Sequence, residues 1–398
     1  MLLLGENNEV EKSLIDVVNV LRAKSQDEGS KDEFPSKNYD YLINADIHKL
    51  TVPNQFGGYE YGFEQTSRVI SQLAMGCPST ALCMAMHFYT VAGLAKTLTS
   101  DQQAVIFGQI SEGHFTTSFN QPNVSIVQAN QDLSQSTELE IQKCETGYII
   151  NGVKRSVSGI NRFTYLPVYG NQKEDRHSRF GITALLATVD DSGVSVKNSW
   201  DCDSMRMTGS HDVLFKDVHI PHDRLIGREG FGIEDTTPLV FWSRLAISSV
   251  YLGIAKAALD YVIQLAKVTT DKISKKRIAF MPGTQFAIAE MRIKFDAANS
   301  QLVTYARQAD EFAKSGKYTD DLFQKALMTK YFVTHTSNEI VWQAMQVAGM
   351  KSLNKNNLLN RLYQDVRAAT FHQPNDDLLK ELLAKKTLGL IAPKNRWL

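Results

Sequence analysis

The stretch LEIQKCETGYIINGVKRS, residues 139–156, decides the fold, because it interrupts a chain that otherwise has helical periodicity. Apolar and polar residues alternate over 139–142, and residues 148–150 are apolar, as is typical of β-strands. Glu145-Thr146-Gly147 predicts a turn between these two strands. Asn151-Gly152 predicts a further hairpin turn, because both residues tolerate positive φ.

More short strands are predicted on the C-terminal side of this stretch. Residues 182–189 form a continuous apolar run that is closed by Asp190-Asp191-Ser192-Gly193. The segments Val213-Leu214-Phe215 and Val218-His219-Ile220-Pro221 close this block of strands. Several short strands at regular spacing indicate a small β-barrel or sandwich in the middle of the chain.

The segments on either side of the strands have helical patterns. Val10, Leu14, Val17, Val18 and Leu21 recur at helical spacing. Residues 245–267 are rich in Ala, Leu and Ile at the same period, and further helical segments follow. We therefore expect an α+β protein with an N-terminal helical domain (1–110), a middle β domain (111–225) and a C-terminal four-helix bundle (226–398).

Composition excludes several classes of function. The 398 residues contain 43 Lys and Arg and 43 Asp and Glu, so the net charge is zero, which gives no reason to expect nucleic acid or an anionic membrane as partner. The four cysteines do not follow metal-ligand spacing, and no metal site is expected. No apolar run approaches the ~20 residues of a membrane span, so we expect a cytoplasmic protein without a membrane partner.

Five segments in this order resemble motifs of the acyl-CoA dehydrogenase superfamily. They are 53–58 ("P-x-x-F-G-G"), 151–155 ("N-G-x-K"), 205–221 ("M-R-x-T-x-S…F-x-D-V-x-I-P"), 252–260 ("G-I-A-x-A-A-L-D") and 361–367 ("R-x-Y-x-D-x-R"). The resemblance covers almost the whole chain. It implies a flavoenzyme whose isoalloxazine ring lies between the β domain and the C-terminal helices, and a homotetramer or a homodimer.

The resemblance also implies which residues bind the flavin. The ring-contacting positions are Asn120, Gln121, Ser156, Val157 and Ser158, and the positions for the pyrophosphate and adenine are Arg277, Phe280, Gln346 and Gly349. The cofactor is FAD or FMN: the motifs for the AMP half are eroded, which favours FMN, whereas FAD is more frequent in the family. Arg277 follows two lysines, so a solvated basic face is an alternative.

The glutamate that serves the family as catalytic base is missing. Gln373 and Ser243 occupy the two positions at which members carry it, and an amide does not accept a proton near pH 7. Asp376 and Asp377 lie one turn beyond Gln373 and are possible substitutes.

A branch of the superfamily, the flavin-dependent monooxygenases of the dibenzothiophene desulfurisation type, is similar at this point. Those enzymes carry "H-D-P" where this chain has His372-Gln373-Pro374, and "S-G" as in Ser158-Gly159. They use O₂ and reduced flavin from a separate flavin reductase, and their sites exclude water. The resemblance implies catalytic roles for His372, His87 and Gln373, because a histidine pKa lies near working pH. Expected to contact the small-molecule substrate are Phe88, Phe241, Trp242, Arg244 and Phe371.

Three functions are consistent with the sequence. The first is a flavin monooxygenase, the second an acyl-CoA dehydrogenase with an unassigned base, and the third a non-catalytic flavin-binding protein. His87 lies in an apolar segment, where a histidine with satisfied hydrogen bonds in the core is the alternative to a catalytic one.

Overall fold

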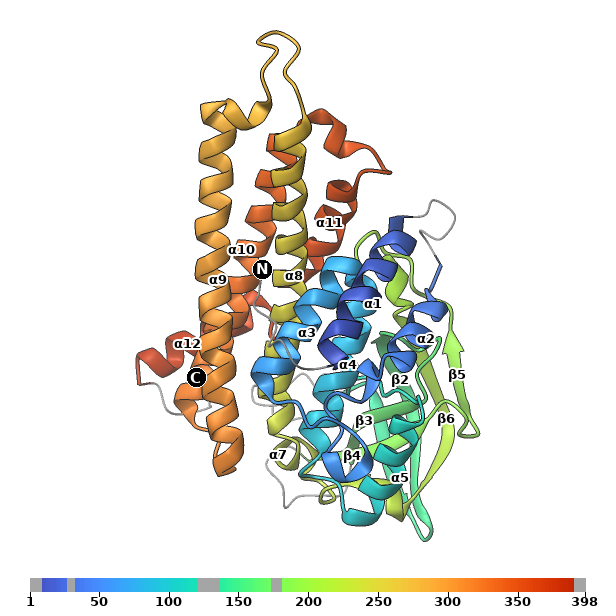
Figure 1. Ribbon diagram of the computed structural model, residues 1–398. Helices are drawn as coiled ribbons and strands as arrows, with labels where there is room; N and C mark the ends of the chain where they lie inside the picture. The colour runs from blue at the N-terminus through green and yellow to red at the C-terminus, as the bar shows by residue number, and fades with distance from the viewer. Residues whose placement is uncertain (1–8, 27–32, 121–136, 173–180, 390–398) are drawn as a thin grey trace.

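The computed structural model describes residues 9–26, 33–120, 137–172 and 181–389, in which a seven-stranded sheet lies to one side of two groups of helices (Figure 1). The helices are α1 (Glu9–Gln26), α2 (Ser36–Asn44), α3 (Phe63–Gly76), α4 (Pro78–Leu94), α5 (Ser100–Ser111), α7 (Gly232–Asp235), α8 (Pro238–Val268), α9 (Pro282–Ser315), α10 (Asp320–Ala348), α11 (Leu358–Val366) and α12 (Asp376–Thr387). The strands are β1 (Leu139–Cys144), β2 (Gly147–Val157), β3 (Tyr165–Gln172), β4 (Ile182–Thr188), β5 (Val194–Lys197), β6 (His211–Pro221) and β7 (Leu225–Ile226).

Short-range chemistry fixes where several helices begin. Helix α5 starts with a capping box, in which the Gln102 backbone N–H donates to Thr99 Oγ1 at 3.3 Å. Helix α12 is capped by Asn375, whose Oδ1 accepts from the Leu378 N–H at 3.2 Å. Pro78 occupies the first turn of α4, where the missing N–H costs nothing.

The sheet has the strand order β5-β6-β2-β1-β3-β4-β7, and β1 and β3 form its parallel pair. Strands β4 and β6 contact each other although three strands separate them in this order. The sheet therefore curls around an apolar core of its own, to which both strands contribute, for example through Leu185 and Val213. The α+β class and the three-part layout predicted from the sequence are confirmed.

The predicted hairpin turn at Asn151-Gly152 is wrong, because both residues lie inside β2. Ile150 pairs with Val218 and Gly152 with Phe215, so β6 has one extra residue opposite Asn151. The Asn151 side chain bridges this bulge: its Oδ1 accepts from the Asp217 N–H at 2.8 Å, and its Nδ2 donates to Asp217 Oδ1 at 3.1 Å. The turn predicted at residues 145–147 does connect β1 with β2.

The N-terminal and C-terminal helices share one hydrophobic core, which extends from Val10 in α1 to Ala369 beyond α11. Helix α8 lies at its centre and packs against α3, α4, α9, α10 and α11. Gly253 allows α8 to approach α3 closely, because a Cβ at this position would collide with the backbone oxygen of Ser71. The cavity described below is thus walled partly by one helical core and partly by the sheet.

By length and composition alone, α8 is apolar enough to cross a membrane, contrary to the sequence expectation that no such segment exists. However, 72% of the most apolar 18-residue stretch of α8 is buried inside the molecule. Its composition reflects its position at the centre of the helical core.

Candidate active site

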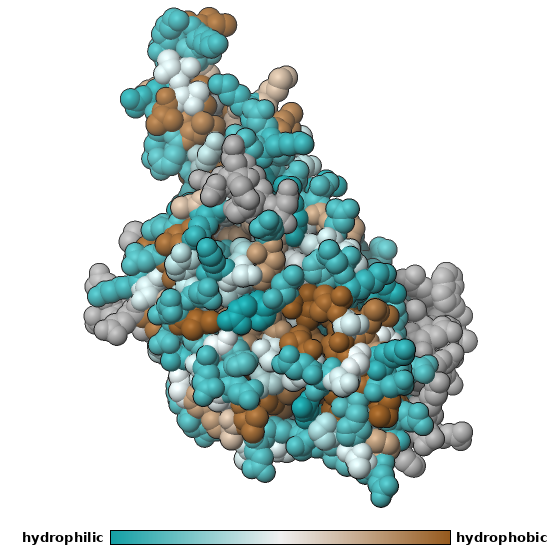
Figure 2. Space-filling view, turned by 90° about the vertical axis from the view of Figure 1, so that its right-hand side faces the viewer, coloured by the Kyte–Doolittle hydropathy of each residue, from teal (hydrophilic) through white to brown (hydrophobic). Residues whose placement is uncertain are grey.

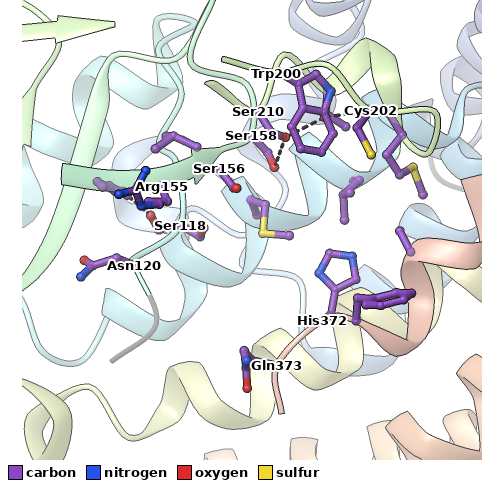
Figure 3. Close-up of a pocket in the computed structure, with 18 of the residues that line it drawn as sticks. Ser118, Asn120, Arg155, Ser156, Ser158, Trp200, Cys202, Ser210, His372 and Gln373 are labelled. Carbon is purple, nitrogen blue, oxygen red and sulfur yellow. Dashed lines mark hydrogen bonds between the residues drawn. The ribbon is translucent and has the colours of Figure 1, made fainter. Parts of the chain in front are cut away.

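A cavity of about 1410 Å³ lies where the sheet meets the helices, with walls from β2, α4, α8 and the segment between α11 and α12. Small-molecule pockets usually measure about 300–1,000 Å³, so this cavity has room for a cofactor together with a substrate. Figure 3 shows strand β2 with Ser156 and Ser158 on one side, His372 and Gln373 on the other, and Trp200 and Cys202 above.

The end of strand β2 and the residue after it bring together three residues predicted to contact a flavin ring, Ser156, Val157 and Ser158. Ser156 has a φ of 52°, because β2 has an extra residue there, and its N–H donates to Asp212 Oδ1 at 3.1 Å. The Ser158 hydroxyl lies 2.9 Å from that of Ser210. A row of hydroxyl groups therefore lines one edge of the cavity, beside the apolar side chain of Val157.

Lys154, on the same strand, is 1% exposed and supports the wall from behind. Its Nζ donates to Thr117 Oγ1 at 3.0 Å, to the Ser118 carbonyl at 2.5 Å and to the Pro167 carbonyl at 2.9 Å. Burial lowers the pKa of Lys154 to about 7. The lysine joins β2 to segment 116–120, which forms the next part of the wall.

Asn120 lines the cavity as predicted by position, but its amide already has partners. Its Oδ1 accepts from the Tyr169 N–H at 2.8 Å, and its Nδ2 donates to the Tyr169 carbonyl at 2.8 Å. The side chain is thus bound to both backbone groups of Tyr169 in β3. Gln121 lies outside the described residues.

His372 and Gln373 form the opposite wall. The Nε2 atom of His372 lies 2.7 Å from the hydroxyl of Tyr251, which belongs to α8. Burial and the nearby charge of Lys330 lower the pKa of His372 to about 4, so the ring is neutral near pH 7. The Lys330 ammonium donates to the Pro374 carbonyl at 3.1 Å and so holds the backbone next to Gln373.

No buried carboxylate lines the cavity among the described residues. Ser243 and Gln373, which stand at the family's two base positions, both line it. The lining carboxylates are exposed and belong to Glu138, Glu140, Asp201 and Asp203. Asp376 contacts His335 at 2.7 Å, and neither it nor Asp377 lines the cavity. A base for a carbon acid requires a desolvated carboxylate, and none of the carboxylates that line the cavity meets that condition.

His87 lies outside the cavity, so the structure does not bring it together with the other predicted site residues. It is completely buried. Its Nδ1 accepts from the Thr116 N–H at 3.2 Å, and its Nε2 lies 2.7 Å from the His48 carbonyl, to which it therefore donates. Burial lowers the pKa of His87 to about 3. The ring is a structural link between α4 and its neighbours.

Most of the predicted substrate residues also lie elsewhere. Phe88, Phe241, Trp242 and Arg244 do not line the cavity, whereas Phe371 does and is 79% exposed. Trp242 stacks on Phe63 with ring centroids 3.7 Å apart, because this face of α8 turns toward α3. Arg244 lies next to the cavity-lining Ser243 and donates from Nη1 to the Val240 carbonyl at 2.6 Å.

The residues predicted to bind the pyrophosphate and adenine are remote from this cavity. Arg277 and Phe280 lie in the connection between α8 and α9, at the tip seen at the top of Figure 1. Gln346 and Gly349 lie at the C-terminal end of α10, toward the same end of the bundle. None of the four lines the cavity of this chain.

Some cavity residues were not predicted as site residues. Ser210 and Lys154 belong to quoted motifs, so the motifs themselves carried the signal. Trp200 lines the cavity and donates from Nε1 to the Arg206 carbonyl at 3.0 Å, and Tyr251 contacts His372 from an apolar helix. Neither has a sequence pattern that distinguishes it from a core aromatic residue.

Fold and cavity define a class of protein, the flavin-dependent oxidoreductases built from helices around a central β domain. Models of the acyl-CoA dehydrogenase N-terminal and C-terminal domains match residues 10–114 and 245–377. The chain belongs to the acyl-CoA dehydrogenase superfamily.

Individual relatives carry different activities. One relative is YdbM of Bacillus subtilis (strain 168), which is named as an acyl-CoA dehydrogenase. The two chains are 27% identical over 357 residues, which cover 88% of this chain and 89% of YdbM. TdsC from Paenibacillus sp. A11-2, a dibenzothiophene monooxygenase, solved with FMN and indole, superposes with a TM-score of 0.86 at 19% identity, over 96% of this chain and 98% of that one. Butyryl-CoA dehydrogenase from Megasphaera elsdenii gives 0.83 at 17% identity, over 97% and 100%.

Proposed function

We propose that the chain is a flavin-dependent monooxygenase that uses reduced flavin and O₂. One observation carries this proposal: the cavity presents the neutral imidazole of His372 and no buried carboxylate among its described lining residues. Dehydrogenation of a thioester requires a base to remove a proton from carbon, whereas oxygen transfer requires a hydrogen-bond donor in a dry site.

The residues present fit a flavin ring. The hydroxyls of Ser156, Ser158 and Ser210 suit the polar edge of the ring, while Val157 and Ile247 offer apolar contacts for its faces. The bound flavin, FMN or FAD, supplies the electrons and the site of reaction with O₂. Arg367, an exposed cation that lines the cavity, is suited to an anionic phosphate.

The remaining walls suit a small apolar substrate. Leu82, Met86 and Phe371 present apolar side chains to the cavity. TdsC, which resembles this chain in fold, is a dibenzothiophene monooxygenase solved with indole, an aromatic heterocycle. A separate flavin reductase, which would supply the reduced flavin, is the proposed partner.

We further propose a homotetramer or homodimer in which the tip of one copy serves the cofactor of another. In Figure 2 the tip projects from the body and bears apolar side chains among polar ones. Ile273 and Phe280 are 93% and 69% exposed, and contact of such large apolar side chains with water is unfavourable in a monomer. In such an assembly the AMP half of FAD bound to a neighbour is contacted by the four residues Arg277, Phe280, Gln346 and Gly349. FMN lacks that half and does not need these contacts.

A second function, an acyl-CoA dehydrogenase with an unassigned base, is favoured by the names of relatives such as the short-chain specific acyl-CoA dehydrogenase of Bos taurus, which is 22% identical.

Isotope-labelled O₂ separates these functions. The chain, FMN, NADH and a flavin reductase are incubated with indole or dibenzothiophene, and products are analysed by mass spectrometry. One labelled oxygen atom in the product supports the proposal. Absence of labelled product, together with oxidation of an acyl-CoA under anaerobic conditions, favours the dehydrogenase.

A further inference from the structure

The hydroxyl of Tyr251 and the Nε2 atom of His372, 2.7 Å apart, form a pair at the edge of the cavity. Tyr251 is completely buried in α8, and His372 lines the cavity. A hydrogen bond at this distance has two possible directions, and each direction puts the imidazole proton on a different nitrogen.

The surroundings of Tyr251 decide between the two directions. Within the described residues, no other polar atom lies within hydrogen-bond distance of its hydroxyl. If Nε2–H donated to the phenol oxygen, the buried phenol proton would have no acceptor there, and a buried donor without an acceptor is unfavourable. Burial and the nearby carboxyl of Asp365 raise the pKa of Tyr251 well above its usual value, so the phenol keeps its proton. The phenol therefore donates, and Nε2 accepts.

This direction places the imidazole proton on Nδ1. Within the described residues Nδ1 has no hydrogen-bond partner, and it is not among the atoms sealed from solvent, so it is open toward the cavity. The charged groups that face the pair are Lys330 on α10 and Asp365 on α11. The ammonium of Lys330 opposes a second proton on the ring, which is consistent with a neutral imidazole.

We propose that Tyr251 is a positioning residue that fixes His372 in its neutral Nδ1–H form, so that His372 presents a hydrogen-bond donor, and not a base, to the cavity. The atom that accepts the hydrogen bond from Nδ1–H is an electron-rich oxygen of the substrate or of bound O₂. This inference rests on the proposed function only in identifying that oxygen. The tautomer itself is a property of the protein without flavin.

The chain contains an internal reference for this assignment. His87 accepts the Thr116 N–H at Nδ1, so its proton is on Nε2, the opposite arrangement. The two histidines therefore predict opposite patterns of nitrogen chemical shift in one sample, because protonated and unprotonated ring nitrogens resonate far apart.

The test is NMR of the flavin-free, full-length chain labelled with nitrogen isotope in histidine. His372→Gln and His87→Gln assign the two signals. We expect the proton of His372 on Nδ1 and that of His87 on Nε2 between pH 5.5 and 8. In Tyr251→Phe the His372 signals should shift to the average of two tautomers, with His87 unchanged.

A proton on Nε2 of His372 in the wild type overturns the proposal, as does an unchanged His372 spectrum in Tyr251→Phe. If that variant does not fold, the wild-type tautomer alone decides. Because no turnover is involved, a failure of the oxygenase assay leaves this result standing, and the reverse also holds.

Discussion

The backbone N–H of Met205 donates to Oδ1 of Asp365 at 2.8 Å, and this bond ties the loop that carries Trp200 to helix α11. The Ser204 hydroxyl adds a bond to the Asp365 carbonyl at 3.2 Å. Met205 has a φ of 51°, a conformation that a side chain adopts at a cost and that these bonds help to hold. A buried carboxyl therefore secures one wall of the cavity.

Asp365→Asn should change how stability depends on pH. Burial raises the pKa of Asp365 from 3.8 to about 6, so the folded state favours the protonated form. The stability that this provides is present below pH 4 and is lost as pH rises through 6. Asn still accepts the Met205 N–H without ionising, so between pH 4.5 and 7.5 the variant should gain ~2 kcal/mol relative to wild type. Urea unfolding at the two pH values measures this gain, and an unchanged difference would contradict the assignment.

Replacement of His372 by Gln should lower the rate of product formation by ~10²–10⁴-fold, because the donor that faces the reacting oxygen is removed or displaced. Flavin affinity, measured by fluorescence titration, should change little. A large loss of flavin binding would instead indicate that His372 is a cofactor ligand.

His87→Gln is the matched comparison, since His87 lies outside the cavity. It should reduce the free energy of unfolding by ~1–3 kcal/mol, because the Thr116 N–H and His48 carbonyl lose well-placed partners. The turnover rate per folded molecule should remain that of the wild type, and a selective loss of turnover would instead indicate a catalytic role for His87.

Lys154→Met tests the buried ammonium. The pKa of Lys154 is about 7 when folded, below its ordinary value of 10.5, so the unfolded chain binds more protons between these values. Wild-type stability relative to the variant should therefore rise as pH increases from 7 to 9. Chemical denaturation at several pH values checks this trend, and a difference that falls with pH would refute it.

Arg277→Ala should weaken FAD binding by about tenfold or more and leave FMN binding unchanged, because one charge-assisted hydrogen bond is worth about 1.5–3 kcal/mol. Arg292→Ala is the control, since Arg292 is exposed on α9 and pairs with Asp296. Equal loss for both flavins would contradict a role limited to the AMP half.

The sequence predicted the elements that depend on local pattern. Apolar periodicity identified the helices, and the turn at Glu145-Thr146-Gly147 is where β1 and β2 join. The turn at Asn151-Gly152 was predicted wrongly because residues that tolerate positive φ occur at β-bulges as well as in turns. The bulge depends on pairing with strand β6, which is distant in the sequence.

Site residues could be predicted where they belong to a sequence motif. They could not be predicted where long-range packing determines which side chains line the cavity. His372 had stronger support from the sequence than His87, for which a core position was the alternative. His372 lines the cavity, whereas His87 on α4 is completely buried outside it. Tyr251 lies in an apolar helix, and its contact with His372 connects positions 121 residues apart. Long-range contacts of this kind leave no local pattern.

An anaerobic titration of the flavin-loaded chain with acyl-CoA thioesters of increasing length tests the central claim most directly. Because no buried carboxylate lines the cavity within the described residues, we expect the absorbance of the oxidised flavin to remain unchanged with each thioester. Stoichiometric bleaching by any of them would contradict the account and show that the chain is a dehydrogenase with a base in another position.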